Sequence, residues 1–324
     1  MRILFAGTPE IAVPSLKAVA EKHTVVGVLT NPDRARGRGR TPEPPPVKQA
    51  AGELGLQVFQ PPMLKGEARK LLSPLKADIL VVFAYGRIFG PKFLDLFPEG
   101  GVNVHPSLLP RYRGSIPIIA PIINGDVETG VTVQKIALKM DTGDILAQKR
   151  FDLDSTINAD QLTVYAADVG AELLLSALSD LEAGTASPVA QDPLYATYCR
   201  KLNKSDGQIN WQLPNYMIER MVRGFFPWPK AFTEWNGKRL TVLASSLPSD
   251  LTSEMVKGSL PSVHNRLGTV LGIDREKGIL VQTGRGVLAI RRLQLQGKQP
   301  LESQAFVNGN KEIIGSQLGD NLWR

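Results

Sequence analysis

The sequence contains very little cysteine and histidine, which excludes several kinds of site. Cys199 is the only cysteine among 324 residues, so neither a disulfide nor a cluster of thiolate metal ligands can form within the chain. The three histidines, His23, His105 and His264, are far apart and lack the short spacing of a typical zinc site. A metal site assembled from distant residues stays open, but no motif argues for one, and we expect no metal.

Long apolar runs and a targeting segment are also lacking. No apolar stretch approaches the ~20 residues that cross a bilayer. The opening "MRILFAGTPE" enters a predicted strand directly, without a basic region followed by a signal-like apolar stretch. We therefore expect a soluble, cytoplasmic protein without a membrane partner. As a separate expectation, the protein is a monomer.

The excess of positive charge is small. The chain has 38 Lys and Arg against 31 Asp and Glu, a net charge of +7. This favours a polyanionic partner, although many basic proteins bind none. The length exceeds the roughly 100–200 residues of a single domain and suggests two domains.

The first half alternates apolar strand signals with amphipathic helix signals. This alternation predicts a Rossmann-like, mostly parallel sheet with helices on both faces. The expected strands are 2–6, 24–30, 56–60, 78–86, 101–105, 130–138 and 144–153, and the expected helices are 12–22, 47–54, 64–75 and 158–184.

The second half has a different pattern. Residues 186–205 contain proline, few aliphatic residues and no clear period, which is typical of a linker. After it, short strands such as "QINWQ", "AFTEWNGKRLTVLAS" and "GILVQTG" are separated by turn signals, with one helix at "NYMIERMVRGF". Such strands indicate a small antiparallel, OB-like β-barrel. The expected parts are thus residues 1–185, a linker at 186–205, and residues 206–324.

The stretch "GVNVHPSLLPRYRG" places two polar side chains at the end of a strand. Asn103 and His105 are two residues apart, so they share one face of the strand, and Pro106 ends the ladder. Open α/β sheets bind ligands at the carboxyl ends of their strands. An amide and an imidazole there can stabilise an oxygen that becomes negative during acyl transfer. From this pattern alone, a structural pair bonded to the backbone stays the favoured alternative.

The turn "KMDTGDIL" supplies a carboxylate. Asp141 can orient an imidazole and raise its basicity, or take a proton through a bridging water. On the residues alone, Asp144 could serve as well, and so could an ordinary turn aspartate.

Together, "NVHPSLLPRYRG" and "MDTGDIL" closely resemble the formyltransferase family that uses 10-formyltetrahydrofolate. The further segments "FAGTPE", "PDRARGRGR", "VVFAYG", "TYCRKLNKSDGQINW" and "VRGFFPWPKAF" extend the likeness over nearly the whole chain, and they are similar to the members that formylate methionyl initiator tRNA. The resemblance implies that Asn103, His105 and Asp141, rather than Asp144, are catalytic. It also implies a formyltransferase domain at 1–185 and a tRNA-binding barrel at 206–324.

The implied reaction moves a formyl group from N10 of the folate to the α-amino group of the methionine on initiator tRNA, as translation initiation requires. Asn103 and His105 would stabilise the oxyanion, and Asp141 would favour a protonated His105 and help to carry the proton. Contacts with the folate are expected at two neighbouring strand ends. They lie near Gly90 of "YGRIFGPKFLD", which is an extra residue compared with the commoner Y-G-x-I-L-P pattern of the family. The expected folate-binding residues are Phe83, Ala84, Tyr85, Gly86, Ser107, Leu108, Leu109 and Pro110.

The segment "NPDRARGRGRTPEPPP" is a second candidate site. It is longer than the usual strand-to-helix connection and carries Arg34, Arg36, Arg38 and Arg40 between alanine and glycine. Such a segment can follow a phosphate backbone, or it can be an ordinary solvated basic loop. In the family this inserted loop meets the tRNA acceptor stem near its 1–72 pair, and Arg38 matches the most important loop arginine.

Three other functions fit parts of the sequence. A sister formyltransferase acting on a small amine, such as an amino sugar nucleotide or glycinamide ribonucleotide, would keep the same catalytic residues. It would have less reason to carry the arginine loop and the barrel. A tRNA-binding protein with a degenerate enzyme domain and a hydrolase that releases formate from the folate are the remaining alternatives.

Overall fold

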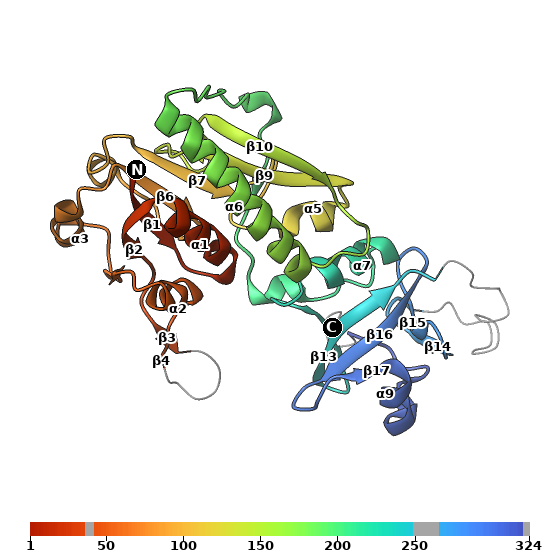
Figure 1. Cartoon of the computed structure of the whole chain (residues 1–324). Helices are drawn as coiled ribbons and strands as arrows, with labels where there is room; N and C mark the ends of the chain where they lie inside the picture. The colour runs from red at the N-terminus through yellow and green to blue at the C-terminus, as the bar shows by residue number, and fades with distance from the viewer. Residues whose placement is uncertain (36–41, 249–265, 320–324) are drawn as a thin grey trace. The chain divides into compact units, whose positions relative to one another are not determined.

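A computed structural model of the chain describes residues 1–35, 42–248 and 266–319, and these form two compact units (Figure 1). The second unit takes in two short segments from the middle of the chain. The domain boundaries expected at residues 185 and 206 stay a prediction. The first unit comprises Met1–Ile118, Val127–Leu153 and Gln161–Lys201, and the second comprises Ile119–Asp126, Asp154–Asp160 and Leu202–Arg324.

The first unit is built on a seven-stranded sheet in the order β10-β9-β7-β6-β1-β2-β5. The five strands from β7 to β5 are parallel, while β9 runs antiparallel to both of its neighbours, β7 and β10. This sheet confirms the expected Rossmann-like architecture. The strands are β1 Arg2–Gly7, β2 Thr24–Leu29, β5 Val58–Phe59, β6 Ile79–Phe83, β7 Gly101–His105, β9 Glu128–Lys135 and β10 Ile145–Asp152.

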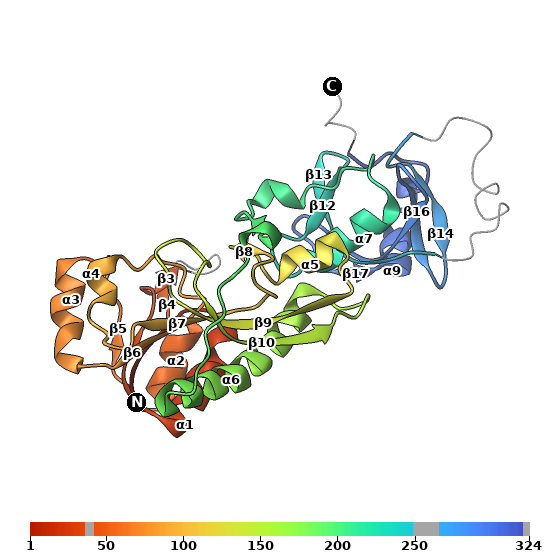
Figure 2. The same ribbon diagram turned by 90° about the horizontal axis from the view of Figure 1, so that it is seen from above.

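Helices cover both faces of this sheet (Figure 2). Successive strand residues point to opposite faces, so Phe5 packs with α1, α2 and α6, whereas Leu4 packs with α3 and α4. Both faces are therefore buried, which explains why the central strands are almost purely apolar. The helices are α1 Val13–Lys22, α2 Pro46–Glu53, α3 Gly66–Leu72, α4 Pro91–Leu94 and α6 Ala159–Ala183.

Helix α6 has the length and composition of a membrane-spanning helix, and it is the only such helix in the described parts of the chain. Half of its most apolar window is buried inside the protein. Leu162, Leu174 and Leu178 of this helix are almost fully buried. Buried core helices can be as long and as apolar as membrane-spanning helices. Packing on the sheet therefore explains the apolar composition of α6.

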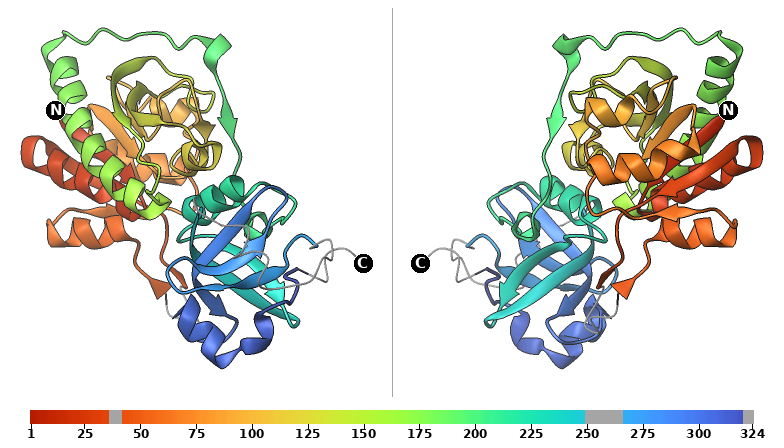
Figure 3. Two further views of the ribbon diagram at one scale, coloured as in Figure 1. Left: turned by 90° about the vertical axis from the view of Figure 1, so that its right-hand side faces the viewer. Right: turned by 90° about the vertical axis from the view of Figure 1, so that its left-hand side faces the viewer.

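The second unit contains an antiparallel sheet in the order β12-β13-β16-β15-β14, with β17 paired to β16. Helix α9 packs against β15 and β16, and α5 packs against α7 (Figure 3). The antiparallel arrangement confirms the fold class expected for the C-terminal part. The elements are α5 Ile119–Asn124, α7 Asn215–Gly224, β12 Ala231–Trp235, β13 Lys238–Ser246, β14 Val270–Asp274, β15 Gly278–Gln282, β16 Val287–Leu295, β17 Leu301–Glu302 and α9 Ser303–Gly309.

The prediction of a strand at "QINWQ" is wrong. Only Gln208 makes an isolated bridge, to Phe232, and the chain then turns because the Asn210 side chain accepts a hydrogen bond from the Gln212 amide. Trp211 is buried by this turn, and its indole N–H donates to Thr233 Oγ1 at 3.1 Å.

Several short elements complete the described chain. Two of them, β8 and β11, pair in parallel within the first unit and bear on the site below. They are β3 Arg34–Ala35, β4 Pro42–Glu43, β8 Arg113–Gly114 and β11 Tyr198–Cys199, with 3-10 helices at Glu10–Ala12, Ser73–Leu75, Pro193–Tyr195, Lys204–Gly207 and Lys311–Ile313.

The packing of β1 predicts the effect of a core truncation. Phe5 lies in the middle of the sheet with no exposed surface, so Phe5→Ala leaves a cavity and should lower the free energy of unfolding by about 3–5 kcal/mol. Urea unfolding measures the change. The control Ile88→Ala removes a side chain that is 73% exposed and should shift stability by no more than about 0.5 kcal/mol. Equal midpoints for Phe5→Ala and the wild type would contradict this packing.

Candidate active site

The C-terminal end of β7 brings the predicted catalytic side chains to one face of the sheet. Val102 and Val104 point into the core, which leaves Asn103 and His105 on the opposite face. In the antiparallel pairing with β9, Asn103 lies opposite Gln134 and His105 lies opposite Thr132. Directly opposed residues share a face, so the Gln134 side chain lies beside Asn103.

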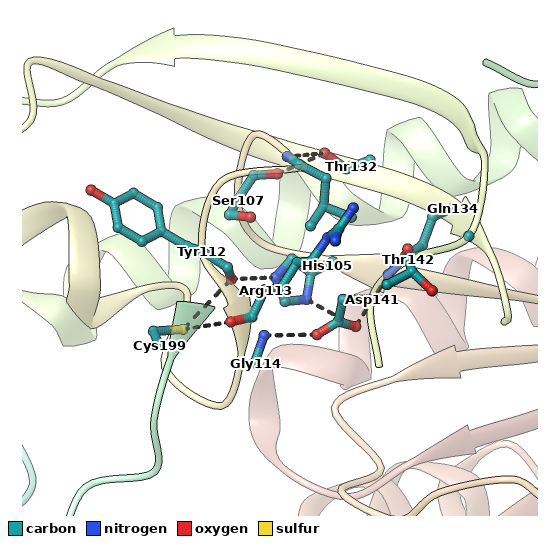
Figure 4. A network of polar contacts seen from close by, with 12 residues as sticks. His105, Ser107, Tyr112, Arg113, Gly114, Thr132, Gln134, Asp141, Thr142 and Cys199 are labelled. Atoms are coloured by element: carbon teal, nitrogen blue, oxygen red, sulfur yellow. Dashed lines mark hydrogen bonds and ion pairs between the residues drawn. The ribbon is translucent and has the colours of Figure 1, made fainter. Parts of the chain in front are cut away.

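The His105 ring is buried between a backbone carbonyl and a carboxylate (Figure 4). Its Nε2 is 2.9 Å from the Tyr112 carbonyl oxygen, and its Nδ1 is 3.7 Å from Asp141 Oδ1. A carbonyl only accepts hydrogen bonds, so Nε2 carries the hydrogen in this contact. In the neutral ring, Nδ1 then holds a lone pair that faces the Asp141 carboxylate.

Burial decides the resting charge of this ring. Desolvation lowers the pKa of His105 below its usual value of about 6.5, and it outweighs the raising effects of the Asp141 carboxylate and the Tyr112 carbonyl. The sequence predicts that the Asp141 carboxylate favours a protonated ring, and the structure adds desolvation, which acts on the pKa in the opposite direction. This lowered pKa favours the neutral form of the ring in the resting site.

Asp141 is held by two hydrogen bonds to its carboxylate. Oδ2 accepts from the Gly114 amide at 2.8 Å, and Oδ1 accepts from Gln134 Nε2 at 3.2 Å. Its backbone is left-handed, with φ of 55°, a region that few non-glycine residues occupy. Within the described parts of the chain, His105 pairs with Asp141 and not with Asp144.

Asn103 has an amide that is available to a ligand. The residue is half-buried, and its side chain has no hydrogen-bond partner among the residues that the structure describes. A polar group that is removed from water costs free energy unless it is hydrogen-bonded, so this amide is suited to bind a polar atom of a substrate.

The loop after β7 positions the carbonyl that His105 contacts. Tyr112 has φ of 59°, which is strained for a bulky residue, and its amide donates to Thr197 Oγ1 at 2.8 Å. The Cys199 thiol also lies 3.5 Å from the Tyr112 carbonyl oxygen. Burial raises the pKa of Cys199, so the thiol stays protonated and can donate. Gly114 must remain glycine, because a Cβ there would lie 2.3 Å from the Cys199 carbonyl oxygen.

The eight expected folate-binding residues follow neighbouring strands, since β6 and β7 are adjacent and parallel. At the end of β6, Ala84 and Gly86 are exposed and both have positive φ. Folate contacts at these positions stay a prediction. Of the others, Phe83, Tyr85, Ser107, Leu108 and Leu109 are buried, and Pro110 is half-buried.

The arginine segment is described only at its two ends. Arg34 is exposed in β3, which pairs with β4, whereas Arg36, Arg38 and Arg40 lie outside the described residues. Near the start of the segment, Asp33 accepts from Lys48 at 2.7 Å and from Gln60, and these hydrogen bonds lower the pKa of Asp33.

Sequence reasoning missed several residues of this site. Thr132 and Gln134 are polar, almost fully buried and alternate along β9, so their spacing on an apolar strand was a usable signal. Gln191, whose amide reaches the Asp141 turn, had no such signal. Among the described residues, no group of three or more His, Cys, Asp or Glu could hold a metal ion.

The histidine environment predicts a measurable titration. NMR should give His105 a pKa below 6.5, and Asp141→Asn should lower it further, because the raising effect of the carboxylate is then removed. His105→Gln identifies the resonance. A wild-type pKa above 6.5, or a rise in Asp141→Asn, would contradict the proposed balance of burial and charge.

Two sequence profiles match the chain. A profile described as formyl transferase matches residues 1–178, and one described as formyl transferase, C-terminal domain, matches residues 201–311.

Curated relatives match over nearly the full length. The chain is 42% identical over 322 residues to the methionyl-tRNA formyltransferase of Treponema denticola, with 97% of this chain and 98% of that protein covered. It is 45% identical over 328 residues to the enzyme of that name from Treponema pallidum strain Nichols, with 98% and 99% covered.

Among solved structures, the N-formyltransferase of Helicobacter canadensis, in complex with folinic acid and dTDP-3-aminofucose, has the same fold. The TM-score is 0.64 at 21% identity, over 89% of this chain and 98% of that one. With two matching profiles and relatives above 40% identity, the chain belongs to the formyl transferase family that includes the methionyl-tRNA formyltransferases.

Proposed function

We infer that the chain transfers a formyl group from 10-formyltetrahydrofolate to the α-amino group of methionyl initiator tRNA. The observation that carries the chemistry is the Asn103 amide, which has no hydrogen-bond partner among the described residues, beside a buried His105–Asp141 pair at the carboxyl edge of the sheet. The acceptor is inferred from the full-length relatives, which are named for methionyl-tRNA. The folate donor is supported by the family and by the folinic acid in the Helicobacter structure.

The donor supplies the formyl group, and the residues of the chain act on the charge and the proton that its transfer creates. As the amine attacks, the formyl oxygen becomes negative, and we assign the Asn103 amide to donate a hydrogen bond to it. Losing one such donor elsewhere costs roughly 100- to 1000-fold in rate. Because the amide is half-buried and has no partner in the described parts of the chain, this hydrogen bond forms without first breaking one to those parts.

The proton of the attacking amine goes to His105 in this proposal. The ring is neutral and its Nδ1 lone pair is free, so it can accept the proton as the new C–N bond forms. The resulting imidazolium is stabilised by Asp141 at 3.7 Å and by the Tyr112 carbonyl on its other nitrogen. The protonated ring then donates to the oxyanion, and afterwards returns the proton to the folate nitrogen as the bond between that nitrogen and the formyl carbon breaks.

The arginine segment is proposed to bind the tRNA acceptor stem through Arg34, Arg36, Arg38 and Arg40. The β3–β4 pairing and the Asp33–Lys48 ion pair fix the two ends from which it extends. We propose that the C-terminal unit contributes a second tRNA-binding surface.

We also propose that the enzyme is a cytoplasmic monomer. A cytoplasmic location suits an enzyme of translation initiation. Size-exclusion chromatography tests whether the enzyme is a monomer.

Turnover with methionyl initiator tRNA tests the catalytic assignment. Asn103→Ala should lower kcat roughly 100- to 1000-fold, because one oxyanion donor is lost. His105→Ala and Asp141→Asn should abolish turnover, and all three variants should still bind tRNA. Asp144→Asn, in the same turn, is the matched control and should keep wild-type turnover. Near-normal turnover in His105→Ala or Asp141→Asn would overturn these roles, and faster formylation of an amino sugar nucleotide than of the tRNA would favour the small-acceptor alternative.

Salt dependence tests the arginine segment. Arg38→Ala should weaken tRNA binding and raise KM for the tRNA, while kcat with saturating tRNA is largely kept. Removing one phosphate contact should reduce the slope of log K against log salt by about 1. Lys17→Ala, at an exposed cation in α1, is the control and should leave the slope unchanged. An unchanged slope in Arg38→Ala would rule out its phosphate contact.

A further inference from the structure

The segment that follows α6 is part of the first unit and contacts the catalytic turn. Val189 exchanges both backbone hydrogen bonds with Ile145, at 2.8 and 2.9 Å, just after the Asp141 turn. Asp192 then caps the 3-10 helix Pro193–Tyr195, and its side chain accepts from the Leu194 amide. Between these two fixed points lies Gln191, in a stretch that neither family profile covers.

The Gln191 side chain uses both ends of its amide. Its Oε1 accepts from Arg113 Nε at 3.0 Å and from Arg113 Nη2 at 2.7 Å. Its Nε2 lies 2.7 Å from the Gly143 carbonyl oxygen, 3.0 Å from the Asp141 carbonyl oxygen and 3.1 Å from Gln134 Oε1. Three acceptors on one side and a guanidinium on the other allow only this orientation of the amide.

These contacts reach Asp141 by two routes. The first holds the backbone, because one NH2 group of Gln191 donates to the carbonyls of both Asp141 and Gly143 in a left-handed turn. The second holds the carboxylate, because Gln134 accepts from Gln191 and donates its own amide to Asp141 Oδ1. An aspartate keeps a left-handed backbone only where the surrounding structure holds it in that conformation. The hydrogen bonds from Gln191 to the Asp141 and Gly143 carbonyls supply much of this constraint.

Arg113 fixes the opposite end of the Gln191 amide. Its side chain is 5% exposed, and its Nη1 donates to Tyr198 Oη at 3.1 Å while the guanidinium packs over the Tyr198 ring. The next residue, Gly114, donates its amide to Asp141 Oδ2. The β8 loop, the segment around Gln191 and the Asp141 turn are therefore joined in one hydrogen-bonded network.

We propose that Gln191 is a positioning residue for Asp141, and that it holds this carboxylate near His105, where it stabilises the protonated ring. The segment between the two matched family regions is then part of the catalytic machinery as well as a connection. The inference rests on the proposed catalytic role of Asp141.

Kinetics give the first test. Gln191→Ala removes all five contacts and should lower kcat about 10- to 100-fold, as expected when a reacting group is displaced, with little change in KM for tRNA. Gln191→Glu should be at least as slow, because its carboxylate keeps Arg113 but repels the carbonyl oxygens of Asp141 and Gly143. Leu194→Ala, in the same segment and 88% exposed, is the control and should match the wild type.

The NMR pKa of His105 separates positioning from a general loss of structure. Gln191→Ala should lower this pKa toward the Asp141→Asn value, because the carboxylate moves away from the ring. In the Asp141→Asn background, adding Gln191→Ala should produce no further shift. Thermal unfolding of each variant allows kcat to be corrected for the folded fraction.

Wild-type values of both the corrected kcat and the His105 pKa in Gln191→Ala would overturn the proposal. So would a fall in kcat without any shift in this pKa, since that would indicate another role. Retained turnover in Asp141→Asn is a separate outcome, because it would remove the catalytic role of Asp141 on which the inference rests.

Discussion

The hydrogen bond from His105 Nε2 to the Tyr112 carbonyl is the interaction on which the site depends. It fixes the tautomer of a buried ring and leaves the Nδ1 lone pair facing Asp141. The carbonyl can occupy this position because Tyr112 is left-handed and its amide is bound by Thr197. A single backbone acceptor thereby determines which nitrogen of the histidine is available for the proposed chemistry.

Burial and charge act on His105 in opposite directions, and function follows from their balance. Desolvation keeps the ring neutral, so it is ready to accept a proton, while the nearby carboxylate stabilises the imidazolium once it forms. A more exposed ring would be less responsive to Asp141, since water would screen the charge. The Asn103 amide lies on the same sheet face, where no protein group competes for it among the described residues.

The sequence predicts the sheet because burial leaves a periodic signal, and it predicts the three side chains of the candidate site through a resemblance to a family. The apolar run at 79–83 and the alternation in "GVNVH" follow directly from burial. The residues alone left Asp144 open, and the resemblance singled out Asp141. The Tyr112 carbonyl and the left-handed turns carry no such signal, because any residue supplies a backbone acceptor. Gln191 lies in an aperiodic segment typical of a linker, and its partners are brought to it by the fold. The neutral state of His105 required knowledge of its burial.

The proposed catalysis requires Asn103, His105 and Asp141 to converge on one reacting carbon. A crystal structure of the Asp141→Asn enzyme with 10-formyltetrahydrofolate and a methionyl acceptor analogue tests this requirement. We expect the Asn103 amide to lie about 3 Å from the formyl oxygen, with His105 Nδ1 facing the acceptor amine. A formyl group bound beyond hydrogen-bonding reach of both side chains would contradict it.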